Sequence, residues 1–229
     1  MTAAIQPFQA LEPFIANWPW FLGLLALLIV VRILGSTRFK GWSGERAVSK
    51  GLSRLDPATY HAFHDLYLPR PDGQGTTQLD HVVVSPFGIV VVETKNYRGW
   101  IFGSEKQAQW TQQIYRQKNR FQNPLHQNDL HVHALMDCLD LPRDAFLPVV
   151  FFIGDAEFKN PVPPNVLNQG LTRWINQHQE IRLDPTAFEK AASTLDQIHR
   201  STNRKVAARG HLVALRERNP SGQANPRHR

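Results

Sequence analysis

Apolar and polar residues along this chain follow the period of β-strands in some segments and the period of α-helices in others. Two short β-branched runs, Val82–Val84 and Ile89–Val92, flank a Ser-Pro-Phe-Gly segment that is typical of a turn. This pattern predicts a β-hairpin. Elsewhere the pattern predicts strands at Tyr60–Leu68, Trp100–Gly103, Trp110–Tyr115 and Leu147–Ile153, and helices that begin at Ser43 and cover Asn123–Leu139, Leu167–His178 and Pro185–His199.

The register of the hairpin places charged residues opposite one another. If Pro86 and Phe87 are the two loop residues, Asp80 lies opposite Glu93, and Gln78 lies opposite Lys95 on the same face. Facing carboxylates repel each other, and the usual compensation is a divalent cation. A turn one residue longer would break the shared face, and a β-bulge could restore it.

The first predicted helix carries an acid on its apolar stripe. Val48, Leu52 and Leu55 recur at i, i+4 and i+7, and Glu45 lies three residues before Val48, so it points the same way. On position alone, the favoured interpretation is that an acid in the first turn stabilises the helix dipole. A functional role for Glu45 is the alternative.

The N-terminal region contains a long apolar segment. Residues 14–31 include only one strongly polar residue, Asn17, and their length is near the minimum for a membrane span of about 17–25 residues. Basic residues follow the segment, which predicts a transmembrane helix at about residues 14–34 with the N-terminus outside. We therefore expect a single-pass protein of the inner (cytoplasmic) membrane, with its remaining residues in the cytoplasm. A buried core helix is the alternative. A cleaved secretory signal is disfavoured, because it would need a basic n-region before the apolar segment and none is present.

The positive charge is concentrated at the C-terminal end. The formal net charge is +7, and residues 200–229 contain eight basic residues and one acidic residue, so the rest of the chain is neutral overall. These residues lack apolar periodicity, which predicts a disordered tail. Their positive charge predicts that the tail binds nucleic acid or anionic lipid. Cys138 is the single cysteine, which excludes an internal disulfide and fits a reducing compartment.

Several short segments resemble, in order, the NERD (nuclease-related) domain of the PD-(D/E)xK nuclease superfamily. Leu79 stands where the superfamily name has Pro, a position that is commonly variable. The resemblance covers roughly Trp42 to Ile153 and implies a restriction-endonuclease-like α/β fold, an αβββαβ core with a mixed central sheet. The segments that carry it are Gly41-Trp42-Ser43-Gly44-Glu45, Gln78 to Val84, Gly88 to Asn96, Gly99-Trp100-Ile101 and Asn123-Pro124-Leu125-His126-Gln127.

The resemblance also implies a metal-dependent nuclease. Asp80 and Glu93 would bind Mg²⁺ or Mn²⁺, with the backbone carbonyl of Thr94 as a third ligand and Glu45 reaching the ion directly or through water. Lys95 would orient the attacking water and contact the scissile phosphate.

Glu45, Asp80, Glu93 and Lys95 would thus be the catalytic set, and the substrate would be nucleic acid, with DNA favoured over RNA. Gln78 and Gln127 would position the metal ligands or the phosphate. Three domains follow, namely residues 1–40 with the membrane helix, 41–199 as the nuclease domain with C-terminal helices, and 200–229 as the basic tail.

Other functions remain open from the sequence. The alternatives to a nuclease are a catalytically silent, membrane-tethered nucleic-acid-binding or scaffold module of the same fold, and a lipid-surface protein whose basic tail is the working part. His126, Asp129 and His133 share one helix face and could bind zinc, although a solvated polar face is favoured.

Overall fold

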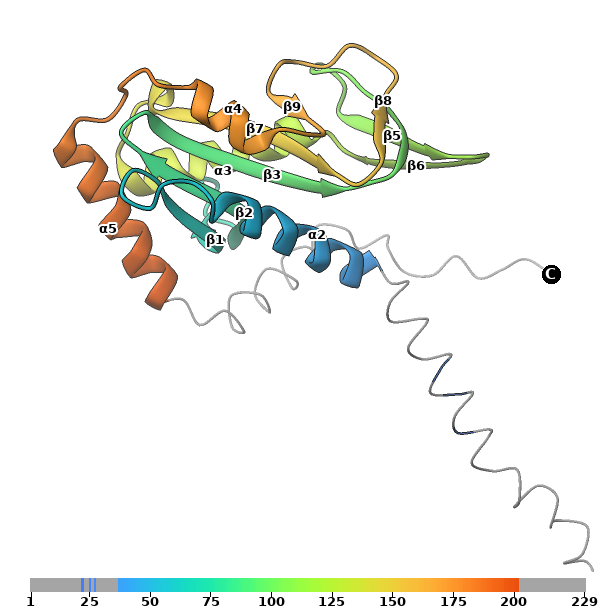
Figure 1. Ribbon diagram of the computed structural model, residues 1–229, viewed down its shortest axis with the longest axis horizontal. Helices are drawn as coiled ribbons and strands as arrows, with labels where there is room; N and C mark the ends of the chain where they lie inside the picture. The colour runs from blue at the N-terminus through green and yellow to red at the C-terminus, as the bar shows by residue number, and fades with distance from the viewer. Residues whose placement is uncertain (1–21, 23–24, 26, 28–36, 202–229) are drawn as a thin grey trace, which may run out of the picture. The chain divides into compact units, whose positions relative to one another are not determined.

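The computed structural model describes residues 22, 25, 27 and 37–201 (Figure 1). The predicted membrane helix therefore lies outside the described residues except for Leu22, Leu25 and Leu27, and the predicted tail does so beyond Ser201. Among the described residues, no helix combines the length and the apolar character that a membrane span requires.

A five-stranded mixed sheet forms the centre of the fold, in the order β1-β2-β3-β7-β9. Strands β1, β2 and β3 are antiparallel, whereas β7 runs parallel to β3 and β9 runs parallel to β7. The β2–β3 ladder runs from the pair Ser85 and Gly88 to the pair His81 and Val92, which confirms the predicted turn and the register next to it. The ladder ends before the predicted pairs of Asp80 with Glu93 and of Gln78 with Lys95, which are not formed. The strands are β1 (His61–Pro69), β2 (Thr76–Ser85), β3 (Gly88–Asn96), β7 (Phe146–Ile153) and β9 (Val166–Leu167).

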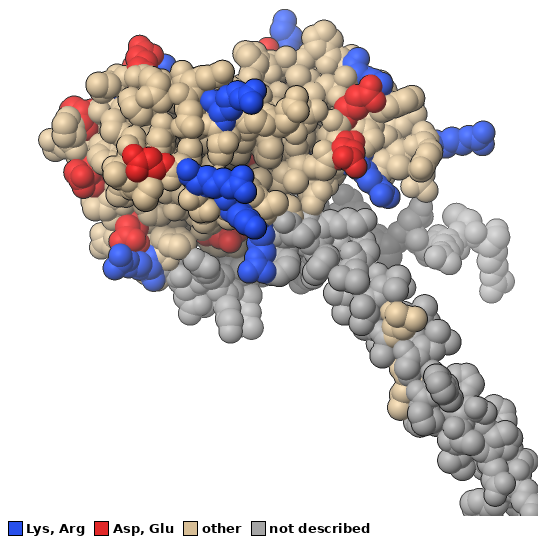
Figure 2. Space-filling view, in the orientation of Figure 1, with Lys and Arg blue, Asp and Glu red and all other residues tan. Residues whose placement is uncertain are grey.

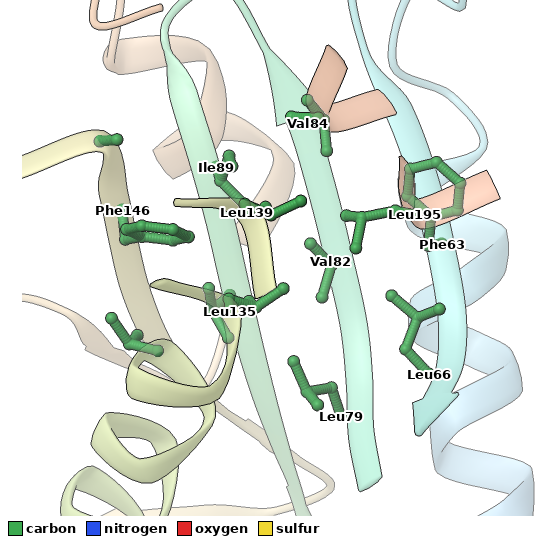
Figure 3. Packing of buried hydrophobic residues seen from close by; sticks show 14 of the residues in the cluster. Phe63, Leu66, Leu79, Val82, Val84, Ile89, Leu135, Leu139, Phe146 and Leu195 are labelled. Carbon is green, nitrogen blue, oxygen red and sulfur yellow. The ribbon is translucent and has the colours of Figure 1, made fainter. Parts of the chain in front are cut away.

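Helices cover both faces of this sheet, because β2 and β3 carry apolar side chains on each side. Helices α3 (Pro124–Leu139) and α5 (Pro185–Ser201) cover one face, where Leu135 and Leu195 pack with Val82 (Figure 3). Helices α2 (Thr37–Leu52) and α4 (Leu171–Gln177) cover the other face, where Leu52 and Ile175 pack with Val83. Alternate residues of one strand thus enter two separate cores.

A second sheet has four strands in the order β6-β5-β4-β8, of which β4, β5 and β6 follow β3 in the chain and β8 follows β7. One of its faces is buried, with Ile101 and Trp110 packed around Phe152 of β7, whose ring stacks on that of Trp110. Strands β5 and β6 extend away from the central sheet as a hairpin (Figure 1). The strands are β4 (Gly99–Phe102), β5 (Gln109–Ile114), β6 (Gln117–Gln122) and β8 (Ala156–Phe158).

Two differences from the predicted elements have clear physical causes. Strand β6 was not predicted, because its sequence Gln-Lys-Asn-Arg-Phe-Gln is polar and its pairing depends on β5. The helix predicted at Leu167–His178 begins only at Leu171, because Gly170 adopts a left-handed conformation with φ 72° and Val166 and Leu167 pair with the edge of β7. The first helix also begins earlier than predicted, at Thr37.

Other predicted features agree with the structure. The predicted caps are present, since the Asn123 side chain accepts a hydrogen bond from the Leu125 amide at 3.0 Å and Asp184 accepts one from the Ala187 amide at 2.8 Å. The order of helix, three strands, helix and strand is present as α2, β1–β3, α3 and β7, with β4–β6 inserted before α3. The mixed α/β architecture of the prediction is therefore correct, and the second sheet is an addition to it.

Candidate active site

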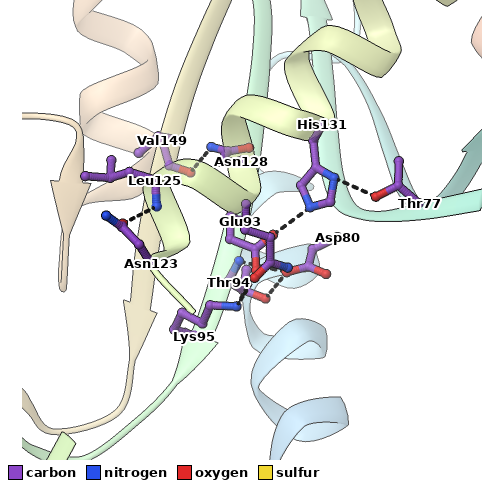
Figure 4. Close-up of polar contacts among 11 residues, drawn as sticks. Thr77, Asp80, Glu93, Thr94, Lys95, Asn123, Leu125, Asn128, His131 and Val149 are labelled. Atoms are coloured by element: carbon purple, nitrogen blue, oxygen red, sulfur yellow. Dashed lines mark hydrogen bonds and ion pairs between the residues drawn. The ribbon is translucent and has the colours of Figure 1, made fainter. Parts of the chain in front are cut away.

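The predicted acidic residues lie where β2 and β3 separate. Their ladder ends at His81 and Val92, after which β2 remains paired with β1 and β3 remains paired with β7. Separation of two strands leaves backbone groups without a ladder partner, and these need another one. The Asp80 carboxylate meets part of this need, because its Oδ2 accepts hydrogen bonds from the Thr94 amide and the Thr94 hydroxyl, each at 2.7 Å (Figure 4).

Glu93 is the most buried acid of the site, with 1% of its surface exposed. Its Oε1 accepts a hydrogen bond from Lys95 Nζ at 2.5 Å, and its Oε2 lies 3.0 Å from Nε2 of His131. Burial alone would raise the pKa of Glu93, but Lys95 and His131 outweigh it and hold the pKa below its usual value. Glu93 is therefore an anion at neutral pH, with a partner on each oxygen.

Lys95 connects β3 to α3. Its Nζ donates to Glu93 and also to Oε1 of Gln127, at 2.9 Å. Burial would lower the pKa of Lys95, but the charge of Glu93 outweighs burial and raises it. The lysine is thus a fixed ammonium group. Gln127 lies beside Lys95, as the sequence interpretation required if it is to act at this site.

Asp80 differs from Glu93 in its ionisation. Burial, together with repulsion from Glu93, raises the pKa of Asp80 to about 8, against the opposing effects of the Thr94 hydrogen bonds and of Lys95. At neutral pH, the protein thus retains a proton on Asp80. A bound cation would favour the ionised form, because it would offset both causes of the shift.

Glu45 reaches this region from α2, on the other side of the sheet. It is half-buried, and burial raises its pKa, with further contributions from Asp65 and then Glu93. Asp65 is an additional acid that the sequence interpretation missed. It lies in β1 with a left-handed φ of 53°, between the paired residues His64 and Leu66, and its Oδ1 accepts a hydrogen bond from Gln78 at 3.2 Å. Gln78 therefore contacts Asp65 and not the expected Lys95.

His131 is the other residue that the sequence interpretation missed. Buried on α3, it contacts Glu93 through Nε2, and its Nδ1 lies 3.0 Å from the hydroxyl of Thr77 in β2. The chain Thr77–His131–Glu93 fixes the orientation of the imidazole between two strands. The available signal was position, because His131 follows Gln127 by four residues and so shares its helix face.

Asn128, next to Gln127, holds α3 against the sheet. Its Nδ2 donates to the carbonyls of Val91 at 3.0 Å and Val149 at 3.1 Å. Val91 lies in β3 and Val149 lies in the neighbouring strand β7, so this one side chain ties α3 to two paired strands. This anchor places the helix end that carries Gln127 and His131.

The described part of the chain contains no group of three or more His, Cys, Asp or Glu side chains that could hold a metal ion. His126, Asp129 and His133 are among the described residues, so the structure does not support a zinc site formed by them. The side chains of Asp129 and His133 are exposed, and His133 Nδ1 contacts the backbone carbonyl of Asp129 at 2.8 Å. At the acidic site, two adjacent carboxylates, Asp80 and Glu93, have internal partners, and Glu45 and Asp65 lie beyond them.

Comparison with known proteins gives three results. Residues 40–153 match the family described as nuclease-related domain, NERD. An uncharacterised protein of Bacillus anthracis is 51% identical over 98 residues, which are 43% of this chain and 46% of that protein, so the match spans about half of the relative. No solved structure matches the chain.

Proposed function

Since the chain belongs to the nuclease-related (NERD) domain family through residues 40–153, we propose that it is a metal-dependent nuclease that hydrolyses phosphodiester bonds of DNA. The observation that carries this proposal is the arrangement where β2 and β3 separate. Two electrostatically coupled carboxylates, Asp80 and Glu93, lie beside a charged lysine, Lys95. A metal-dependent phosphodiesterase needs oxygen ligands and a positive group of this kind at one point.

Asp80 and Glu93 would hold Mg²⁺ or Mn²⁺, with the Thr94 carbonyl as a further ligand and Glu45 contacting the ion through water. Carboxylate oxygens are the donors that these ions prefer, and Mg²⁺ is commonly bound by only one or two carboxylates together with waters and substrate phosphates. A site of two adjacent acids is compatible with this mode even though no three-ligand group is present among the described residues. When bound, the ion would neutralise phosphate charge and lower the pKa of a water.

Lys95 is proposed to act on the water and the scissile phosphate. An ammonium group donates hydrogen bonds but does not ligate a cation. Its present partners, Glu93 and Gln127, hold Nζ next to the two metal-binding acids. When a cation occupies the Glu93 carboxylate, Lys95 can donate to a phosphate oxygen while Gln127 still accepts from it. The role of Gln127 is therefore to position Lys95.

Glu45 and Asp65 extend the negative region on the side of α2. The raised pKa of Glu45, caused by burial and by its two acidic neighbours, indicates a negative potential that would attract cations. Gln78 is proposed to orient Asp65 through their hydrogen bond. Asp65 is thus added to the predicted set of functional acids.

The decisive experiment is a cleavage assay with the purified full chain. Plasmid, single-stranded DNA and RNA would each be incubated with Mg²⁺, Mn²⁺ or EDTA. We expect cleavage with either metal and none with EDTA, and Glu93→Gln should remove the activity and so exclude a contaminating nuclease. Activity that persists in EDTA, or the absence of cleavage of every substrate with either metal, would contradict the proposal.

A second candidate function is a nucleic-acid-binding module of the same fold without turnover. One observation favours it, namely that both Glu93 oxygens already have partners, Lys95 and His131, within the chain. A protein that binds nucleic acid but neither titrates Mn²⁺ nor cleaves would identify this function. Calorimetric titration with Mn²⁺ separates the two candidates, because only the nuclease needs the ion.

We also propose that residues 14–34 anchor the chain in the inner membrane, with the nuclease domain in the cytoplasm. The support is the apolar segment and the basic residues that follow it, including Arg32, Arg38 and Lys40. Single cysteines introduced near each end would be labelled with a membrane-impermeant reagent in intact cells. Labelling of the C-terminal cysteine, or recovery of the chain in the soluble fraction, would contradict this topology.

A further inference from the structure

The second sheet has an outer face that no core residue covers. Cross-strand pairs arrange its side chains in two rows, because residues paired across a sheet share a face. One row is Glu157, Trp100, Gln113 and Lys118, and the other is Phe102, Thr111 and Arg120. The intervening residues, such as Ile101, point to the buried side. We refer to the face formed by these two rows as the outer sheet face.

Three hollows follow one another along the outer sheet face. A hollow of about 480 Å³ lies between Arg98, Trp100 and Tyr115, and a second of about 480 Å³ is lined by Lys118 and Arg120. A third of about 330 Å³ continues past Phe102. Neighbouring hollows share lining residues, Gln113 between the first two and Phe102, Thr111 and Arg120 between the last two. They therefore form a continuous track that suits an elongated ligand.

Two aromatic rings are presented to solvent at one end of this track. Trp100 is 45% exposed, and Tyr115 is 93% exposed. Tyr115 also occupies a left-handed position with φ 52° in the turn between β5 and β6, where Gly, Asn or Asp would fit with less strain. A large aromatic residue that gains no burial and strains its turn serves no packing purpose. Its exposed ring is available for a ligand.

The track is bordered by positive charge. Residues 97–122 contain five basic residues and one acid, Glu105. Arg98, Arg116, Lys118 and Arg120 are exposed, and none forms an ion pair with another residue in the described part of the chain (Figure 2 shows basic side chains projecting at the end formed by β5 and β6). Asp155 lines the first hollow, and Lys159, which lies over the Trp100 ring at 4.6 Å, forms an ion pair with Glu157 and so adds no net charge. The surplus of cations fits a polyanion.

We propose that the outer sheet face binds single-stranded nucleic acid, a substrate class that deepens the proposed nuclease function and rests on it. Bases stack on Trp100 and Tyr115, and Arg98, Lys118 and Arg120 contact the phosphates. Stacking on protein rings requires unpaired bases, which a duplex does not offer. A basic groove with aromatic platforms is the arrangement that binds single strands without sequence preference.

The position of the outer sheet face connects it to the candidate active site. Trp100 follows Lys95 by five residues, and five residues span at most about 18 Å when fully extended. A single strand held on Trp100 is therefore within a few nucleotides of Lys95. Binding on this face would deliver the backbone of the strand toward the acids.

The test is a binding measurement that does not depend on cleavage. The full chain would be titrated in EDTA against a fluorescent single-stranded oligonucleotide and against its duplex, with anisotropy as the readout. We expect tighter binding of the single strand. Trp100→Ala should weaken single-strand binding by roughly five- to 150-fold and leave duplex binding unchanged, because stacking is lost. Trp100→Phe keeps a stacking ring and should restore most of the affinity.

The phosphate contacts are tested by salt dependence. The double variant Lys118→Glu, Arg120→Glu should reduce the slope of log K against log salt by roughly 1.4, because each single-strand phosphate contact contributes about 0.7. The matched control is Arg173→Glu, Lys190→Glu, which makes the same change in net charge at exposed positions on α4 and α5. We expect its slope to equal that of the wild type.

These outcomes separate the binding proposal from the nuclease proposal. Equal affinity of Trp100→Ala and wild type for the single strand, or equal slopes for the two double variants, would overturn the binding proposal. Equal losses in Trp100→Ala and Trp100→Phe would overturn the stacking of bases. Intact single-strand binding without any cleavage would support the binding proposal and contradict the nuclease proposal.

Discussion

The pattern Glu-x-Lys occurs at the ends of two strands, and the two copies lie in opposite environments. Both Glu93-Thr94-Lys95 in β3 and Glu157-Phe158-Lys159 at β8 form an ion pair between the lysine Nζ and a glutamate oxygen. The Glu93 side chain is 2% exposed, whereas that of Glu157 is 61% exposed. The same local sequence therefore forms a buried polar centre in one place and a surface pair in the other.

The difference arises from what surrounds each pair. Gln127 and His131 of α3 contact the first pair, and Asp80 lies beside it. No third charged or polar side chain joins the second pair among the described residues, apart from the contact of Lys159 with the Trp100 ring. A sequence motif of three residues is thus a weak functional signal. The neighbours brought by tertiary structure give the first copy its chemistry.

The largest expected contrast between the two copies is in catalysis. Glu93→Gln removes a proposed metal ligand at nearly constant volume, whereas Glu157→Gln changes an exposed carboxylate. A bound metal supplies several kcal/mol of transition-state stabilisation, so Glu93→Gln should lower kcat by about 10³-fold or more. Cleavage assays at saturating substrate should show no change for Glu157→Gln. Similar losses in both variants would remove the basis of the comparison.

The next contrast is in folding stability. Lys95→Ala leaves the buried Glu93 carboxylate without its ammonium partner, which should cost about 3–5 kcal/mol in the free energy of unfolding. Lys159→Ala breaks an exposed pair and should cost at most about 1 kcal/mol. Urea unfolding of the metal-free proteins measures both values. A cost below about 1 kcal/mol for Lys95→Ala would show that Glu93 is hydrated or protonated.

His131 provides a sharper test of what distinguishes the buried copy. His131→Ala leaves Glu93 Oε2 without its partner, which should cost about 1–3 kcal/mol in stability. Because His131 positions a proposed ligand, Mn²⁺ affinity should also fall by about 10–100-fold. His133→Ala on the exposed face of the same helix is the control. Calorimetry that gives wild-type Mn²⁺ affinity for His131→Ala would limit this histidine to a structural role.

The smallest expected effect is the pH dependence of the metal-free protein. The pKa of Asp80 is raised from 3.8 to about 8, so the folded state retains a proton that the unfolded state has lost, and stability falls as pH rises through this window. His81 has the opposite effect on stability. Burial, and then repulsion from its neighbour His64, lowers the pKa of His81 from 6.5 to about 3. The contribution of His81 to the free energy of unfolding therefore rises with pH up to 6.5.

Above pH 6.5, the contribution of His81 no longer changes with pH, so the effect of Asp80 on stability is not opposed by it. The free energy of unfolding should decrease by about 1–2 kcal/mol between pH 6.5 and pH 8. Asp80→Asn should abolish most of this decrease, and urea unfolding in EDTA at the two pH values measures it. An Asp80→Asn variant with the same pH dependence as the wild type would assign the effect to another group.

The local parts of the fold were predictable from the sequence. The turn at Pro86 and Phe87 is two residues long, and β-branched residues flank it closely, so the strands and their register as far as His81 and Val92 followed from the short-range pattern. The separation of the strands beyond that pair did not. The caps of α3 and α5 followed for the same reason. These features depend on residues that are near one another in the sequence.

The missed parts depend on contacts between distant segments. Asp65 lies next to the site only because β1 pairs with β2 across a Pro- and Gly-containing loop, and a left-handed aspartate within a strand has no periodic signal. His131 lies in the sequence between Asp129 and His133, whose side chains are both exposed. Only the packing of α3 on β3 shows that His131 itself is buried. The outer sheet face was likewise unpredictable, because β6 has no apolar pattern.

The pairing of β3 with β7 has a consequence for the order of events during synthesis. Glu93 pairs with Val150, 57 residues later, and the intervening segment includes the second sheet and α3. Such a distant parallel pairing closes slowly compared with a hairpin. As the chain leaves the ribosome, we expect the β2–β3 hairpin to form first and to wait for α3 and β7. Until α3 has emerged, the acids would lack the histidine and glutamine that hold them in place, and until Ile153 has emerged, β3 would lack its partner β7.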